Sequence, residues 1–184
     1  MTAHAAGYPH WVPGAFAVVG SYSLVGQSIA WMQHLSGAID PDSTGWVHVI
    51  TGLRDGMIGE AEPGGYRVVP FHYDPSMVWW SMGRLPHDEP TVLQAGTVVA
   101  QAHRMAQLKV GYSELDYLAI AAHQWHLPAP GLRGYIKASG HLICSQALDM
   151  QYQLAKYRLF DDNRWNGYVR PCDLAQLIGA PPRR

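Results

Sequence analysis

The residues best suited to chemistry lie in the stretch 139–148, where Cys144 sits close to the predicted start of a helix. Ser139 or Gly140 would cap this helix, since a short hydroxyl or a glycine suits the residue before the first turn. A thiol at this position lies at the positive end of the helix dipole, which favours the thiolate over the thiol. The N–H groups of the same turn could hold the oxyanion of an attacked carbonyl. Cys144 is therefore a candidate nucleophile, and the alternative is a small buried apolar residue.

A thiol hydrolase also needs a base that holds its proton and a group that orients the base. His48 and Glu60 fit these roles, because they lie on predicted neighbouring strands that bring side chains of one face together. The carboxylate would accept from one imidazole nitrogen and leave the other to face sulfur. Glu62 competes with Glu60 for the third role. Each residue also has an ordinary interpretation, as a half-buried histidine or a solvated glutamate.

The elements that must position these residues follow from local patterns. Short runs of β-branched and aromatic residues predict strands at 15–20, 46–50, 57–61, 66–71 and 78–82. Asp55-Gly56 is a strong hairpin signal, so three of these strands form an antiparallel meander. Apolar residues at helical spacing predict helices at 23–35, 91–110, 112–125 and 171–178, and one around Cys144 that begins after Ser139 or Gly140 and ends near 157. This order predicts an α+β fold, with residues 1–14 as a flexible lead-in and 15–184 as a single domain.

Composition narrows the classes of function. The chain has 184 residues, 48% of them apolar, and a formal net charge of -1, so we expect a globular protein that does not bind nucleic acid. Cys144 and Cys172 are too few for a disulfide framework, although one disulfide between them would remove the nucleophile. No apolar run reaches the roughly 18 residues of a membrane span, and the N-terminus lacks a signal-peptide pattern. We therefore expect a cytoplasmic protein, or one that is phage-borne or specially exported.

Three motifs follow one another along the chain: Trp-Val-His-Val at 46–49, Gly-Glu-Ala-Glu-Pro-Gly-Gly-Tyr-Arg-Val at 59–68 and Ile-Cys-Ser-Gln at 143–146. They resemble the circularly permuted branch of the NlpC/P60 papain-like superfamily, which has a strand histidine, an E-A…G-G-V hairpin and a later C-S-E/Q helix. Weaker likenesses extend the resemblance over residues 15–178. The sequence departs from the pattern at Ile50, where glycine is common, at Gln146, where glutamate is frequent, and at Cys172, which replaces a glycine.

The resemblance implies a permuted papain-like fold, a small antiparallel sheet packed against helices. It implies that Cys144 is the nucleophile, His48 the base and Glu60 the third member of a triad, with no metal and no cofactor. The implied activity is that of a cysteine peptidase or amidase acting on bacterial cell-wall peptides, although permuted members also include enzymes acting on lipid acyl groups. Aromatic residues could line a substrate groove or belong to the core: Trp46, Trp79, Trp80, Tyr112, Tyr135 and Trp165.

Two other interpretations stay open. His141 and Cys144, like His123 and His126, are three residues apart and would share a helix face, as ligands of a metal do. Alternatively, a papain-like scaffold could serve as a non-catalytic binding or structural module, for instance with partners in a phage particle or an exported assembly.

Overall fold

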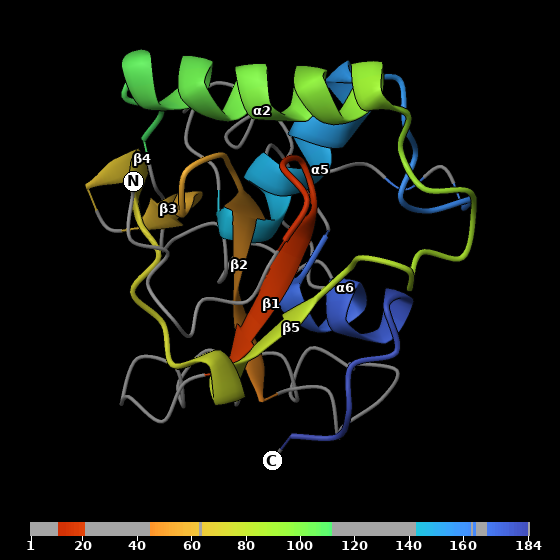
Figure 1. The fold of residues 1–184 in the computed structure, drawn as a ribbon. Coiled ribbons are helices and arrows are strands. Elements are labelled where there is room, and N and C mark those ends of the chain that lie inside the picture. Colours follow the sequence, from red (N-terminus) through yellow and green to blue (C-terminus); the bar gives the residue numbers. More distant parts are fainter. Residues whose placement is uncertain are drawn as a thin grey trace, which may run out of the picture.

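The computed structural model describes residues 11–20, 45–62, 64–111, 143–162, 164 and 169–183. The strands are β1 (Phe16–Gly20), β2 (Trp46–Gly52), β3 (Met57–Glu62), β4 (Gly65–Pro70) and β5 (Val78–Trp80), with the 3-10 turn η2 (Pro75–Met77) before β5. The helices are α2 (Val92–Gln107), α5 (Cys144–Leu154) and α6 (Pro171–Leu177) (Figure 1). The α+β class is confirmed. The predicted helices at 23–35 and 112–125 lie outside the described residues.

The five strands form one antiparallel sheet in the order β4-β3-β2-β1-β5. The predicted hairpin joins β2 and β3: Asp55 and Gly56 both have positive φ, at 56° and 73°. Met57 N–H donates to the Arg54 carbonyl at 3.0 Å and closes the turn, and Leu53 N–H donates to the Met57 carbonyl at 2.9 Å. Positive φ at both central residues is the type I′ geometry that matches strand twist, which explains why Asp-Gly marks this turn.

The pairing of β1 with β2 is irregular beside His48. Val19 pairs with His48, but the next residue, Gly20, pairs with Trp46. Val47 is therefore an extra residue on β2, as in a β-bulge. Bulges re-aim nearby side chains and are frequent next to active sites. The irregularity thus sets the direction of the His48 side chain at the start of β2.

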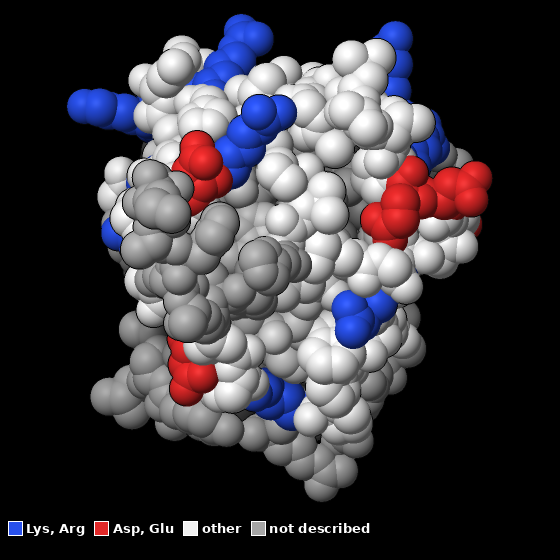
Figure 2. Space-filling view, in the orientation of Figure 1, with Lys and Arg blue, Asp and Glu red and all other residues white. Residues whose placement is uncertain are grey.

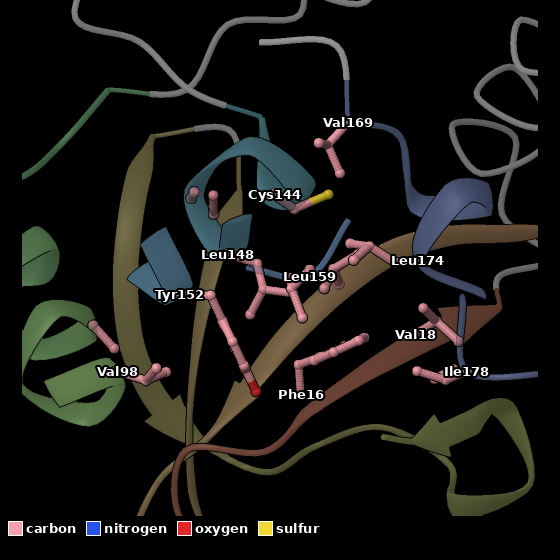
Figure 3. Packing of buried hydrophobic residues seen from close by; sticks show 14 of the residues in the cluster. Phe16, Val18, Val98, Cys144, Leu148, Tyr152, Leu159, Val169, Leu174 and Ile178 are labelled. Carbon is pink, nitrogen blue, oxygen red and sulfur yellow. The ribbon is translucent and has the colours of Figure 1, made fainter. Parts of the chain in front are cut away.

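Apolar side chains pack on both faces of the sheet. On one face, Phe16, Val18 and Val49 join residues of α2, α5 and α6 in the larger core (Figure 3). Figure 1 shows α2 lying across the end of the sheet, with α5 between it and the strands. The alternate strand residues form a second cluster on the other face: Ala17, Val19, Ile50, Ile58, Phe71, Val78 and Trp80. The alternation of a strand explains this division.

A buried polar chain fastens α5 to the sheet. Thr51 Oγ1 donates to Gln151 Oε1 at 2.8 Å, and Gln151 Nε2 donates to Tyr66 Oη at 2.8 Å. Tyr66 reaches Gln151 by crossing β3 at Gly59, where an added Cβ would lie 2.4 Å from the tyrosine hydroxyl. Because buried polar groups are costly when unpaired, this chain fixes the position of α5 relative to β2 and β4.

The structure corrects the predicted start of the cysteine helix. The N-cap of α5 is Ile143, rather than Ser139 or Gly140, and Cys144 is the first helical residue. Gln146 Oε1 accepts from the Ile143 N–H at 3.1 Å, as the glutamine of a capping box does, while the N-cap side chain itself makes no capping hydrogen bond. The helix ends at Leu154, three residues before the predicted end. The motif thus encodes its own cap within Ile-Cys-Ser-Gln.

Both ends of the described chain contact the sheet. Trp11, within the expected lead-in, stacks on Trp80 at 4.8 Å between ring centroids and donates from Nε1 to the Leu53 carbonyl. Near the C-terminus, the Arg183 guanidinium lies 4.8 Å from the Trp46 ring, and the Arg183 carbonyl accepts from the Gly45 N–H. Arg183 thus holds Gly45 and Trp46, which precede His48 by three and two residues. None of the described helices has both the length and the apolar character to cross a membrane.

Substitution of Gly59 by alanine tests the tie between α5 and the sheet. The new methyl would displace the Tyr66 hydroxyl from Gln151, so we expect Gly59→Ala to lower the free energy of unfolding by about 1–3 kcal/mol. Gly96→Ala is the matched control, because Gly96 lies within α2 with open space at its Cβ position. That change should stabilise the protein by about 0.5–1 kcal/mol. Urea unfolding measures both, and equal effects of the two changes would contradict the proposed crossing.

Candidate active site

The three predicted site residues come from three elements. Cys144 is the first residue of α5, His48 belongs to β2 and Glu60 to β3. Figure 3 shows Cys144 at the N-terminal turn of α5, with its sulfur pointing away from the helix axis. The Cys144 residue is buried, with 3% of its surface exposed, and packs with the larger core. Its contact with His48 is what separates it from an ordinary core cysteine.

His48 lies between the thiol and two carboxylates. Its Nε2 is 3.5 Å from Glu60 Oε2 and 3.5 Å from Glu62 Oε1. These are ion-pair distances, and Nε2 forms no well-aligned hydrogen bond in the structure. The imidazole also interacts with the Cys144 thiol through a hydrogen bond and through charge. Because Nε2 faces the carboxylates, Nδ1 is the nitrogen left to face sulfur.

The charge state of His48 follows from these neighbours. Burial alone would lower its pKa, because an imidazolium loses hydration. The negative charge of Cys144, the hydrogen bond with Cys144, the contact with Glu60 and the charge of Glu62 outweigh burial and raise the pKa from 6.5 to about 10. His48 is therefore an imidazolium at neutral pH, paired with negative charge on both sides. A thiolate beside an imidazolium is the reactive state of a cysteine nucleophile.

Glu60 is fixed from several sides and is fully buried, with 0% exposure. Arg67 donates to its Oε1 from Nε at 2.8 Å, and Tyr73 donates to its Oε2 at 2.6 Å. Burial would raise the pKa of this carboxyl. The contact with His48, the hydrogen bond from Tyr73, the charge of His48 and the hydrogen bond from Arg67 outweigh it and lower the pKa to about 2. The carboxylate therefore stays ionised wherever the protein is folded at ordinary pH.

The first turn of α5 is anchored beside the thiol. Ser145 Oγ donates to the Val169 carbonyl at 2.6 Å, and Gln146 caps the turn through Ile143. Ser145 and Gln146 are both fully buried. A rigid turn holds the sulfur and the neighbouring backbone N–H groups in one arrangement, which is what a preorganised site requires.

The second cysteine has a different environment. Cys172 lies in α6, and no disulfide joins it to Cys144. Burial and the charge of Asp173 raise the pKa of its thiol to about 12. Cys172 is thus a protonated core thiol at neutral pH.

Sequence reasoning missed Arg67 and Tyr73. Arg67 pairs directly with Glu60 across β3 and β4, so the hairpin register and the opposite charges were a usable signal. Tyr73 lies after the end of β4, and its side chain contacts Glu60 because the chain turns back toward β3. The spacing of apolar residues in the sequence does not indicate this contact. Its ring also lies 5.9 Å from the His48 ring, so it forms one wall beside the imidazole.

A metal ion is the competing explanation for this group. The ligand atoms of His48, Glu60 and Glu62 lie within 4.8 Å of one another. However, the Arg67 guanidinium already pairs with Glu60 at 2.7 Å and compensates the negative charge of this carboxylate. An imidazolium between carboxylates accounts for the arrangement without a second cation. The other proposed metal pairs rest on His123, His126 and His141, which lie outside the described residues.

The aromatic residues are divided between the core and undescribed segments. Trp46 and Trp80 are buried in the two clusters and so do not line an open groove. Trp79 is half-buried, with the Arg84 guanidinium 4.5 Å from its ring. Tyr112, Tyr135 and Trp165 lie outside the described residues.

On the face seen in Figure 2, basic and acidic side chains are interspersed and form no extended area of one sign. Comparison of the chain with protein-family models, curated proteins and solved structures gives no match. The fold class and the site geometry are therefore the basis for assigning a function.

Proposed function

We propose that this protein is a cysteine hydrolase that transfers an acyl group to water. Cys144 is the nucleophile, His48 the acid and base, and Glu60 the group that orients His48. The observation that carries the proposal is the position of His48, which interacts with Cys144 on one side and with the buried Glu60 on the other. At Cys172, by contrast, burial and the charge of Asp173 raise the pKa of the thiol.

The reaction follows from these groups. The Cys144 thiolate attacks the carbonyl carbon of an amide or ester, a C–S bond forms, and the carbonyl π electrons move to oxygen. When the tetrahedral intermediate collapses, the bond to the leaving group breaks and His48 gives it a proton. His48 then takes a proton from water as the water oxygen attacks the thioester. Cleavage of the C–S bond then releases the carboxylic acid and the Cys144 thiolate. His48 holds the proton taken from water, so the thiolate–imidazolium pair is restored.

The oxyanion would form next to the first turn of α5. N–H groups in the first turn of a helix have no acceptor within the helix and point toward its N-terminal end. The Cys144 backbone N–H lies in this turn, beside the reacting sulfur. Preorganised donors of this kind contribute several kcal/mol to acyl transfer. The helix therefore supplies both the nucleophile and part of the charge stabilisation.

For the substrate we propose an amide bond in bacterial cell-wall peptides. The support is the resemblance of the three motifs to permuted NlpC/P60 enzymes, since those motifs contain the residues that meet in the site. Incubation with purified peptidoglycan, read by mass spectrometry, should release peptide fragments with wild-type protein and none with Cys144→Ala. Release of fatty acid from short-chain phospholipid, with intact peptidoglycan, would contradict this substrate and indicate a lipid acyl hydrolase or transferase.

Iodoacetamide labelling across pH tests the chemistry itself. We expect Cys144 to react at least about ten-fold faster than Cys172 near neutral pH, and to keep reacting at pH 6, where an ordinary thiol with a pKa of about 8.5 is protonated. His48→Ala should slow the labelling of Cys144, because the imidazolium that stabilises the thiolate is gone. Peptide mapping of the labelled protein identifies the site.

Cys172→Ala is the matched control and should leave the labelling of Cys144 unchanged. Equal, slow labelling of the two cysteines, with no effect of His48→Ala, would contradict the enzyme proposal. That outcome would favour a papain-like scaffold that serves as a binding or structural module.

A further inference from the structure

The carboxylate that orients His48 has two candidates at equal distance. Glu60 Oε2 and Glu62 Oε1 both lie 3.5 Å from His48 Nε2. Distance alone therefore does not decide which of them holds the imidazole. Their surroundings differ in burial and in the number of groups that fix each carboxylate.

Glu60 is held by contacts on both of its oxygens. The Arg67 guanidinium contacts Oε1 through Nε at 2.8 Å and Nη2 at 2.7 Å, and the Tyr73 hydroxyl contacts Oε2 at 2.6 Å. Charge-assisted hydrogen bonds of this length are stronger and more directional than neutral ones. The oxygen that faces His48 thus has one fixed position, and the fully buried side chain has no room for another.

Glu62 lacks this support. Its side chain is 34% exposed, and His48 is its ion-pair partner among the described residues. A half-exposed glutamate with a single partner keeps much of its rotamer freedom and is screened by water. Its carboxylate can therefore add charge near His48 without fixing the direction of the ring.

Tyr73 fixes the ring from another side. Its hydroxyl donates to Glu60, and its ring lies 5.9 Å from the imidazole with an interplanar angle of 41°. Burial and the charge of Glu60 raise the pKa of Tyr73, so the hydroxyl keeps the proton it donates. One residue thus restrains both the carboxylate and the imidazole.

We infer that Arg67 and Tyr73 are positioning residues for the Cys144 reaction, and that they make Glu60, rather than Glu62, the orienting carboxylate. They fix Glu60 Oε2 against His48 Nε2, which directs the other ring nitrogen at sulfur. This inference rests on the proposed function. Arg67 lies within the second sequence motif, which gives it no role of its own, and Tyr73 lies outside all three motifs.

The test has two measurements. The first compares Tyr73→Phe, Arg67→Met and Glu62→Gln in the rate of Cys144 acylation by an activated ester, over a range of pH. Loss of positioning should lower this rate about ten- to a hundred-fold for Tyr73→Phe and Arg67→Met, through kcat rather than KM. Arg67→Lys should recover part of the loss, and Glu62→Gln should lose less than either.

The matched control is Tyr157→Phe, which removes a tyrosine hydroxyl bonded to the Asp88 carbonyl, away from the site. It should leave the rate unchanged, because Tyr157 has no contact with the site residues among its described interactions. A loss in Glu62→Gln equal to that in Tyr73→Phe, or no loss in Tyr73→Phe and Arg67→Met, would overturn the inference.

The second measurement separates this inference from the proposed function. NMR titration of the His48 ring protons does not require activity, and its midpoint should fall further in Glu60→Gln than in Glu62→Gln. A wild-type protein that reacts with no acyl donor would refute the hydrolase, while the titration would still decide which carboxylate holds His48. A larger fall in Glu62→Gln would reverse the assignment.

Discussion

A fully buried carboxylate in the middle of a β-sheet is the constraint on which this structure depends. An ionised glutamate loses its hydration when it is buried and is stable only when charges and donors replace the water. Arg67, Tyr73 and His48 supply them to Glu60, from β4, the segment after β4, and β2. The need to satisfy one charge thus brings three parts of the chain to a single point.

The rest of the fold brings the thiol to that point. The irregularity at Val47 turns His48 at the start of β2, and the buried chain from Thr51 through Gln151 to Tyr66 holds α5 against the sheet. Because α5 begins at Cys144, the orientation of the helix fixes the position of the sulfur. A hydrogen bond between His48 and Cys144 is the consequence.

Much of this arrangement could be predicted from local signals. The strands, the Asp55-Gly56 turn and α2 with its Thr91 cap follow from alternation, turn chemistry and capping, which depend on neighbours in sequence. The start of α5 could not, since its cap is a glutamine side chain that reaches back rather than a serine ahead of the helix. Tyr73 was missed for a related reason: its role depends on where the chain returns after β4. The roles of Cys144, His48 and Glu60 in catalysis stay predictions.

The most direct measurement of the central claim is the NMR titration of the His48 ring in the wild-type protein and in Cys144→Ala. Burial lowers the His48 pKa, whereas the sulfur charge, the carboxylates and their hydrogen bonds raise it, so the wild-type ring should stay protonated until the pH approaches about 10. Loss of the sulfur should move the midpoint to lower pH. A ring that titrates near 6.5 in both proteins would show that sulfur, imidazole and carboxylate are not coupled, and would contradict the account.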